Sequence, residues 1–402
     1  MAVSKGTGKS VSYKKETTFG TLAGTSGAKY LRRVTSAMNL KKEVYESSEI
    51  RVDRQTADMR HGVRSAEGSL NGELSPTSYG DFMQAIVARD FTLGAVSATM
   101  SVTIAASGSL WTVTRATGSF LTDLFNVGKV IALTGGTLNV LNTSKNLLIV
   151  SMTATVLTVK VLNGTALLAE GPIASVIATV RGKDTFVPST GHTDQSFTIE
   201  EFYSDITQSE VYTGMKASSM NTQLPATGLA TVDFSFAGAD LGQTGTSQYF
   251  TSPTAQGTDG IFAAVQGAVV VNGLPAALIT SADFTVERAT ENAVAVGSNS
   301  VQDIFTGRIK CTGNLSVYFQ DATFRDYFKD ETVVSLVLAL ATSNAANADF
   351  ISYTIPKVKL GSFTKSDSEL GLTASTSFTA LLNDIGTLGL PLTTIQIQDS
   401  TL

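Results

Sequence analysis

The sequence contains one stretch that resembles part of a nucleotide-binding loop. GTGKS at 6–10 has the Gly-Lys-Ser end of a phosphate-binding loop, in which backbone amides hold the phosphates. The motif needs a first glycine where Val3 stands, and it needs a preceding hydrophobic strand that the sequence lacks. The sequence therefore predicts a basic arm here rather than a nucleotide site.

The histidines also lack the spacing of a metal or hydrolase site. The chain has 2 histidines, His61 and His192, and neither belongs to an H-x-x-x-H pattern. His192 lies close to Asp194 and Ser196, but no G-x-S-x-G motif accompanies them. The carboxylates of EEFYSD (200–205) are typical of a strand and its edge loop. We predict no enzyme activity, no cofactor and no metal site.

Composition excludes further classes of protein. The net charge of −5 and the scattered basic pairs argue against a dedicated nucleic-acid binder. The single cysteine, Cys311, excludes an internal disulfide and is predicted to be a buried, inert thiol. No apolar run is long enough for a membrane helix, and no secretory signal is visible. The charged content is only 16%, which fits a β-rich chain. We expect a protein that is made in a reducing cytoplasm.

One combination of predicted strand and helix occurs twice in the sequence. RHGVRSAEGSLNGELSPTSYGDF (60–82) and FTGRIKCTGNLSVYFQDATFRDY (305–327) share Gly, Leu and Asp positions at a constant spacing of 245. Upstream, the same spacing pairs Ser36 with Ser281 and Ala37 with Ala282. Each copy has a strand of alternating polarity, expected at 66–74 and 312–319, and then a helix, expected at 78–88 and 323–329. Capping boxes are predicted at Ser78-x-x-Asp81 and Thr323-x-x-Asp326.

A second pair of similar segments locates an insertion. Residues 216–236 resemble 359–379 at a spacing of 143, so the first copy carries 245 − 143 = 102 extra residues. The extra residues, about 95–185, are Val-, Leu- and Thr-rich with Gly and Asn turns. They predict an all-β inserted barrel or sandwich.

Four regions follow from these spacings. Residues 1–35 form a polar, loosely ordered N-terminal arm. Residues 36–94 and 186–245 form the first domain, 95–185 the insert, and 246–402 the second domain. Long polar segments at 45–64 and 289–308 occupy equivalent positions in the two copies. Loops of that length usually have a function, so we expect both to reach out and contact another molecule.

Three segments resemble a known family. SYKKETTFGTLAGT (12–25), SSEIRVDRQTADMRHGVRSAEGSL (47–70) and QDIFTGRIKCTGNLSVYFQD (302–321) are similar to the tail tube proteins of long non-contractile-tailed bacteriophages. The resemblance implies a mainly β fold, with two packed antiparallel sheets and a short flanking helix in each of two tandem tail-tube domains. It also implies self-assembly into stacked rings that form a hollow conduit for DNA passage into the host. Because the chain holds two copies, we expect trimeric, pseudo-hexameric rings.

The resemblance gives roles to the polar residues of the copied elements. The strand faces that carry Glu67, Ser69, Asn71, Glu73, Asn314 and Ser316 are expected to line the lumen. An acidic or neutral lumen lets DNA slide, whereas rows of Lys or Arg would bind phosphates. An ordinary solvent-facing sheet is the alternative. Candidate contacts between rings are Glu49, Arg51, Asp53, Arg54, Asp58, Arg60, Asn299, Gln302 and Asp303.

The resemblance also implies partners. The chain would bind copies of itself, a tape measure protein in the lumen, a tail terminator and distal tail or baseplate proteins. Double-stranded DNA would pass without specific binding, and the chain would not insert into a membrane. We expect the protein in the virion tail, assembled in the bacterial host cytoplasm, with the insert projecting outward. Another β-structural virion component (fibre, capsid or decoration protein) and a carbohydrate-binding β-module are the alternatives.

Overall fold

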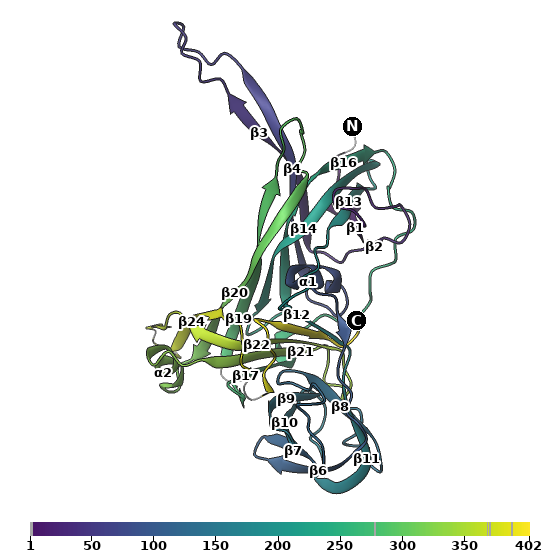
Figure 1. The fold of residues 1–402 in the computed structure, drawn as a ribbon, viewed down its shortest axis with the longest axis vertical. Helices are drawn as coiled ribbons and strands as arrows, with labels where there is room; N and C mark the ends of the chain where they lie inside the picture. The colour runs from purple at the N-terminus through teal and green to yellow at the C-terminus, as the bar shows by residue number, and fades with distance from the viewer. Residues whose placement is uncertain (1–2, 277–278, 368, 370, 387–388) are drawn as a thin grey trace.

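The fold is mainly β, as predicted, in a computed structural model that describes residues 3–402 apart from 277–278, 368, 370 and 387–388 (Figure 1). Within these described residues, nineteen strands join in one connected set of sheets and six others close a barrel. The helices are α1 (Gly80–Val87) and α2 (Thr323–Lys329), with short 3-10 turns η1 (Gly6–Gly8) and η2 (Ala264–Gln266).

A row of antiparallel strands runs through the whole molecule, and we call it the long sheet. Its order is β3–β4–β15–β14–β19–β20–β24, with the short β23 beside β24. Its strands are β3 (Thr35–Glu46), β4 (Met59–Glu73), β15 (Thr231–Gly238), β14 (Gln208–Leu224), β19 (Ile279–Ala293), β20 (Asp303–Tyr318), β24 (Thr373–Ala380) and β23 (Thr364–Lys365).

Two further sheets cover one face of the long sheet. The first back sheet has the order β2–β1–β13–β14–β16, and β14 bends from it into the long sheet. The second has the order β18–β17–β21–β22–β25–β12–β5. Their remaining strands are β1 (Lys9–Lys15), β2 (Lys29–Tyr30), β13 (Phe197–Tyr203), β16 (Asp240–Gly245), β17 (Gly267–Val271), β18 (Leu274–Pro275), β21 (Val334–Ala341), β22 (Phe350–Leu360), β25 (Gln396–Asp399), β12 (Lys183–Phe186) and β5 (Thr92–Leu93).

One set of pairings occurs twice along the chain. In the first strand set, β13 and β14 pair with β1 and β16, and β3–β4–β15 leads back to β14. In the second strand set, β21 and β22 pair with β17 and β25, and β19–β20–β24 leads back to β22. β14 of the first set pairs with β19 of the second. The division into domains at the stated residues stays a prediction.

The register corrects one detail of the predicted duplication. Leu70 of β4 corresponds to Leu315 of β20, at the predicted spacing of 245, because both are buried on the same face. Ser36 lies opposite Leu70, however, whereas Ala282 lies opposite Leu315. The spacing between β3 and β19 is therefore 282 − 36 = 246. The Ser36–Ser281 and Ala37–Ala282 identities are one residue out of register. The bulges of the two hairpins correspond, but 12 residues separate the pair Glu46–Met59 and only 11 separate the corresponding pair Asn292–Ile304.

The predicted capping boxes are wrong, although α1 and α2 lie where helices were expected. α1 begins after Tyr79 and α2 after Ala322, and neither residue caps its helix through a side chain. Asp81 instead accepts hydrogen bonds from the Tyr13 hydroxyl at 2.9 Å and the Lys29 ammonium at 2.7 Å. The carboxylate that the pattern assigned to a cap thus ties α1 to β1 and β2.

The N-terminal region is also more ordered than the sequence suggested. Residues 9–15 form β1, which pairs along its whole length with β13. Val11 and Tyr13 of this strand are buried in the main core. This part of the chain is therefore integral to the first back sheet rather than a loosely ordered lead-in.

The segment between β5 and β12 forms a closed barrel with the strand order β10–β7–β6–β11–β8–β9. The barrel strands are β6 (Met100–Ser107), β7 (Leu110–Arg115), β8 (Val130–Gly135), β9 (Leu147–Met152), β10 (Val156–Val161) and β11 (Glu170–Val180). Its core continues into β21, where Val337, Ala339 and Ala341 face the barrel. Leu336, Leu338 and Leu340 of the same strand face the long sheet. The second back sheet thus separates the barrel from the long sheet.

Candidate assembly surfaces

The six residues predicted to line a lumen lie on one face of the long sheet. Glu67, Ser69, Asn71 and Glu73 alternate along β4 with the buried residues Ala66 and Leu70. On β20, Asn314 and Ser316 alternate with the buried Gly313, Leu315 and Val317. The opposite face carries the core, so these six side chains point away from both back sheets. They reach solvent partly or fully in the single chain.

This face, which we call the polar face, carries more acids than bases. The face spans residues 35–41, 67–73, 219–223, 231–235, 281–287, 310–318 and 373–379. Its acidic side chains are Glu67, Glu73, Asp233, Asp283 and Glu287, and its basic ones are Lys41 and Lys310. Lys41 Nζ lies 3.2 Å from Glu67 Oε2. The balance of charge on the polar face is therefore negative.

Hydrogen bonds between neighbouring strands tie the polar side chains down. The Asn71 amide donates to Asp233 Oδ1 at 2.6 Å, across β4 and β15. Ser316 and Ser375 make the corresponding contact across β20 and β24, with their hydroxyl oxygens 3.3 Å apart. The Asn314 amide donates to Asp283 Oδ2 at 2.9 Å. These groups satisfy one another, so the face offers few free donors to a ligand.

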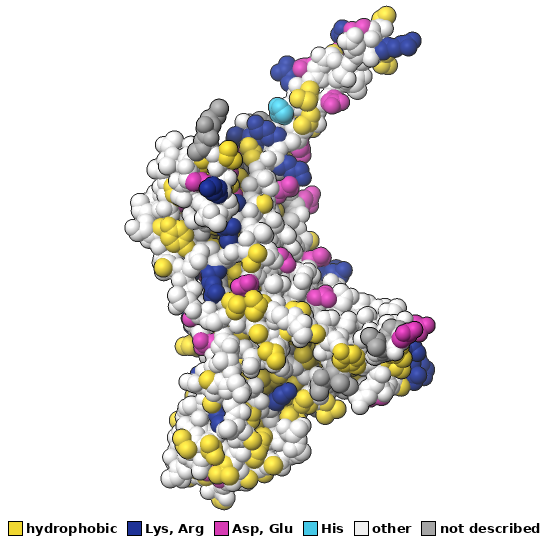
Figure 2. All heavy atoms as spheres, turned by 180° about the vertical axis from the view of Figure 1, so that it is seen from behind, with side chains coloured by type: hydrophobic (Ala, Val, Ile, Leu, Met, Phe, Trp, Pro, Cys, Tyr) yellow, Lys and Arg dark blue, Asp and Glu magenta, His cyan; other side chains and the backbone are white. Residues whose placement is uncertain are grey.

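The hairpin of β3 and β4 rises away from the rest of the molecule (Figure 1). Charged side chains gather along this hairpin and at its tip in Figure 2. Arg51 lies 3.0 Å from Asp53, and Arg60 lies 2.9 Å from Asp58. The predicted contact residues Glu49, Arg51, Asp53, Arg54, Asp58 and Arg60 are all exposed here. Ile50 and Val52 are completely exposed between them, and the sequence reading did not single them out.

The hairpin of β19 and β20 behaves differently, contrary to the expectation that both long segments reach out. Its loop covers residues 294–302 and is shorter than the loop of the first hairpin, 47–58. Both loops are also shorter than the segments predicted, because much of each segment belongs to the strands. Asn299 accepts a backbone hydrogen bond from Arg64 at 2.8 Å, and Val301 and Ile304 pack against Ala239. Gln302 is exposed and donates to Ser298 Oγ at 2.7 Å.

Asp303, the last predicted contact residue, belongs to a cluster of charges where β14 meets β19. Lys216 Nζ lies 3.0 Å from Asp303 Oδ1 and also contacts Asp194. The Arg288 guanidinium lies 3.2 Å from Asp194. Burial, the largest single influence, opposes ionisation of Asp303, but the hydrogen bonds from Lys216 and from the Ile304 amide, with the charge of Lys216, together outweigh it and lower the pKa of this carboxyl. The sequence identified Lys216 only as the first residue of a repeated segment. It did not predict that Asp194 and Arg288 would join Lys216 in one cluster.

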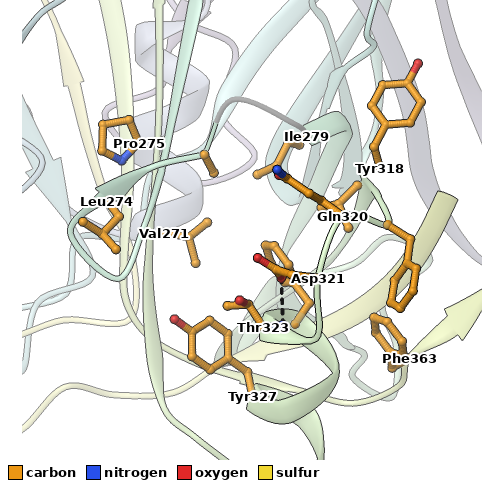
Figure 3. A pocket seen from close by; sticks show the side chains of 14 residues that line it. Val271, Leu274, Pro275, Ile279, Tyr318, Gln320, Asp321, Thr323, Tyr327 and Phe363 are labelled. Atoms are coloured by element: carbon orange, nitrogen blue, oxygen red, sulfur yellow. Dashed lines mark hydrogen bonds between the residues drawn. The ribbon is translucent and has the colours of Figure 1, made fainter. Parts of the chain in front are cut away.

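An apolar hollow of about 320 Å³ opens beside α2 (Figure 3). Tyr327 and Phe324 line it from α2, and Val271 and Leu274 line it from the β17–β18 turn. The Thr323 amide donates to Asp321 Oδ1 at 2.9 Å at its edge. None of the described residues of α2 is fully buried, whereas α1 is buried over most of its length.

The residues that could do chemistry lie apart. His61 lies on β4 and His192 in the segment before β13, and both are exposed. Lys9, from the GTGKS stretch, lies 2.7 Å from Glu201 Oε2. Cys311 is buried, as predicted, and burial raises the pKa of its thiol to about 12. Within the described residues, no group of three His, Cys, Asp or Glu side chains could hold a metal.

Comparison with known proteins identifies the family. The sequence matches the family of phage tail tube proteins over residues 6–380, which is nearly the whole chain. The chain belongs to this family. No curated protein matches it. Among the described residues, no helix is long and apolar enough to cross a membrane.

Membership in the phage tail tube family gives the role of the surfaces in outline. The chain is a structural protein of the phage tail, and its family associates with itself and with other tail components. The mainly β fold agrees with that role. The duplicated strand sets, the polar face and the exposed hairpin are then the features from which an assembly must be built.

Proposed function

We propose that three copies of this chain close into a ring, and that stacked rings form a hollow tail tube through which DNA passes. The observation that carries the proposal is the long sheet. It runs through both strand sets in one row, and its polar face has no covering layer among the described residues. Each chain supplies two strand sets, so three chains supply six and give a pseudo-hexameric ring.

The sheet edges support closure. In the described part of the chain, β3 pairs only with β4 and β23 pairs only with β24, so each end of the row leaves one edge open. Open edges of this kind invite uncontrolled pairing, and a closed barrel removes them. Joining the two ends of the row between neighbouring copies would turn three long sheets into one barrel around a lumen.

The charge and position of the polar face fit such a lumen. Glu67, Glu73, Asp233, Asp283 and Glu287 outnumber the two lysines of the face. A surface of this charge does not bind the DNA backbone, whereas rows of basic residues would release counterions and hold it. The barrel lies beyond the second back sheet, on the other side from the polar face, so it would project outward.

The exposed β3–β4 hairpin would contact the neighbouring ring. Its tip presents two fully exposed apolar side chains, Ile50 and Val52, among ion-paired Arg and Asp residues. Apolar groups surrounded by polar ones are typical of protein–protein contacts. The tape measure, terminator and baseplate partners, the absence of catalysis and assembly in the host cytoplasm belong to the same proposal.

Electron microscopy of the purified chain tests it. Hollow rods or rings with threefold symmetry and six similar lobes, together with the mass of three chains per ring, are expected. Rings that contain six chains would contradict the pseudo-hexamer and retain a tube. A chain that stays monomeric at high concentration, alone and with preformed tail tips, would overturn the proposal.

A further inference from the structure

The contact between the two strand sets inside one chain shows how a contact between two chains would look. β14 pairs with β19 from Ser219 opposite Glu287 to Leu224 opposite Ala282. Both partners have counterparts at the open edges of the long sheet. The first part of β14 corresponds to β22, and its last part, which pairs with β19, corresponds to the segment that follows β22. The counterpart of β19 is β3.

The register fixes which residues correspond. Lys216 lies opposite Ala237, and Lys359 lies opposite Thr379, so β14 maps to β22 with a spacing of 359 − 216 = 143. β3 maps to β19 with the spacing of 246 given above. Residues 219–224 thus correspond to 362–367, and residues 282–287 correspond to 36–41.

The charge cluster at the internal contact is half present at the open edge. Lys359 Nζ lies 3.0 Å from Glu331 Oε2, as Lys216 lies against Asp194. Both lysines precede the edge segment by the same number of residues. Each acid lies three residues before the start of the strand that pairs with β14 or β22. Among the described residues, this second pair has neither of the two further partners that Asp303 and Arg288 provide in the first.

Exposure shows the same difference. The Lys216 side chain is 4% exposed and that of Lys359 is 44% exposed. The Asp194 side chain is 42% exposed and that of Glu331 is 80% exposed. The bases of the internal cluster are buried, whereas the base of the corresponding pair at the edge of the second strand set is exposed to water.

The two missing charges exist at the opposite edge of the molecule. The spacing of 246 takes Arg288 to Lys42 on β3, and the spacing of 245 takes Asp303 to Asp58 before β4. Both counterparts have the required sign, and both are exposed in the single chain. Neither Lys42 nor Asp58 can reach Glu331 within one chain, because they lie at the other end of the long sheet (Figure 1).

The apolar residues of the two contacts agree with this correspondence. Met220 and Val286 lie opposite each other in the internal contact, and both are 0% exposed. Their counterparts, Phe363 and Leu40, are only half-buried in the single chain. Pairing of the two edges would bring Phe363 and Leu40 together and cover both.

We propose that the Glu331–Lys359 pair of one chain is completed by Lys42 and Asp58 of a second copy, with residues 362–367 of the first chain paired antiparallel to residues 36–41 of the second. The proposal rests on the ring proposed above and names its contacts. An exposed ion pair contributes little, whereas removing one partner of a pair whose base is buried is costly, so the second copy would convert a weak surface pair into part of the interface. Lys42 replaces Arg288 and lacks its forked geometry, so we expect this contact to be the weaker of the two.

Charge exchange tests the ion cluster. Lys359→Glu and Asp58→Lys should each reduce ring formation at least tenfold, measured as the trimer fraction in sedimentation velocity. The double variant should restore it, because the two charges are exchanged. Lys357→Glu is the matched control, since Lys357 lies on the same strand, pairs with Asp384 at 3.5 Å and has no counterpart in the internal cluster. Failure of the double variant to recover, with both single variants folded by circular dichroism, would contradict the cluster.

Disulfide trapping tests the register independently. Asn221 lies opposite Thr285 in the internal contact, so Thr364 of one chain should lie opposite Asn39 of the next. Thr364→Cys combined with Asn39→Cys should form chain-to-chain disulfides under mild oxidation, up to a closed trimer. Ser366→Cys combined with Asn39→Cys is shifted by two residues on the same face and should crosslink at most one tenth as well. Cys311 is buried and will not interfere.

The two proposals fail in different ways. Rings seen by electron microscopy without the predicted crosslink or charge rescue would overturn this interface and leave the tube proposal standing. A wild-type chain that forms no rings would overturn both. Preferential crosslinking of the shifted pair would show that the edges meet in another register.

Discussion

The two strand sets share their pairings but differ in how completely each is covered. In the first set, α1 is buried between β14, β12 and β19, and its Phe82 packs against the rings of Tyr13, Phe197, Phe234 and Phe236. In the second set, α2 stands beside an apolar hollow with no fully buried residue among those described. The contrast lies in what packs on each helix. β19 of the second set contacts α1, whereas the hollow beside α2 is not filled by any described residue.

One substituted position accounts for part of the hollow. Tyr13 lies opposite Ile199, which lies opposite Tyr212, and in the second set Val271 lies opposite Leu336, which lies opposite Ile355. Val271 thus takes the place of Tyr13, and its smaller side chain cannot reach the helix. Tyr13 bonds Asp81 through its hydroxyl, which a valine cannot do. The helix of the second set has therefore lost both an apolar and a polar contact.

The largest expected effect separates the two helices. Phe82 is 0% exposed, and its counterpart at the spacing of 245 is Tyr327, which is half-buried. Phe82→Ala removes a ring from a closed aromatic cluster and should lower the free energy of unfolding by about 3–5 kcal/mol. Tyr327→Ala should cost less than about 1.5 kcal/mol in the single chain, because water already reaches its ring. Urea unfolding followed by fluorescence measures both, and equal losses would contradict the comparison.

The two lysines of the junctions give the next effect. Lys216→Ala removes a buried ammonium and leaves Asp194 and Asp303 with Arg288 as the one remaining base of the cluster, so it should cost about 2 kcal/mol. Lys359→Ala removes an exposed pair and should cost about 0–1 kcal/mol in the single chain. Thermal unfolding below the concentration of ring formation measures both. If Lys359→Ala destabilised the monomer as much as Lys216→Ala, its cluster would already be complete within one chain.

The sequence predicted much of the polar face because a period of two residues decides which side chains share a face. Leu70, Leu315 and Val317 could be assigned to the buried face from alternation alone, and the structure buries all three. The helices were predicted from the spacing of Ser78 and Asp81 and of Thr323 and Asp326, and α1 and α2 lie in those regions. Their caps were wrong because Asp81 has stronger partners in Tyr13 and Lys29, which come from distant strands. A local pattern carries no information about such contacts.

The junction could not be predicted because it depends on register across separate segments. Lys216 and Lys359 were recognisable as a repeated pair, but Asp194 lies 22 residues before Lys216 in an irregular segment. The one-residue difference between β3 and β19 also changes which residue corresponds to Arg288. Sequence identity at the spacing of 245 gives Glu43, whereas the strand pairing gives Lys42, which has the opposite charge. Only the structure decides between them.

The loop of the second hairpin should matter more to the single chain than that of the first. Val301 is 4% exposed and packs with Ile304 and Ala239. Val301→Ala should lower the free energy of unfolding by about 1–2 kcal/mol, since it leaves a cavity between the two strand sets. Hydrogen exchange should show faster opening at Arg64, whose amide donates to Asn299. An unchanged exchange rate at Arg64 would mean that the loop is not held by this contact.

The first hairpin should give the smallest effect on the chain and a selective effect on assembly. Ile50 and Val52 are fully exposed, so Ile50→Ser combined with Val52→Ser should change the free energy of unfolding by less than about 0.5 kcal/mol. If the tip contacts the neighbouring ring, the same variant should form trimers normally and yield short stacks or single rings by electron microscopy. Val296→Ser is the matched control, because Val296 is equally exposed on the other hairpin. Rods of normal length from the double variant would remove the tip from the contact between rings. They would leave the contact within each ring untouched, because the residues proposed for that contact, including Lys42, Asp58 and 362–367, are unchanged in this variant.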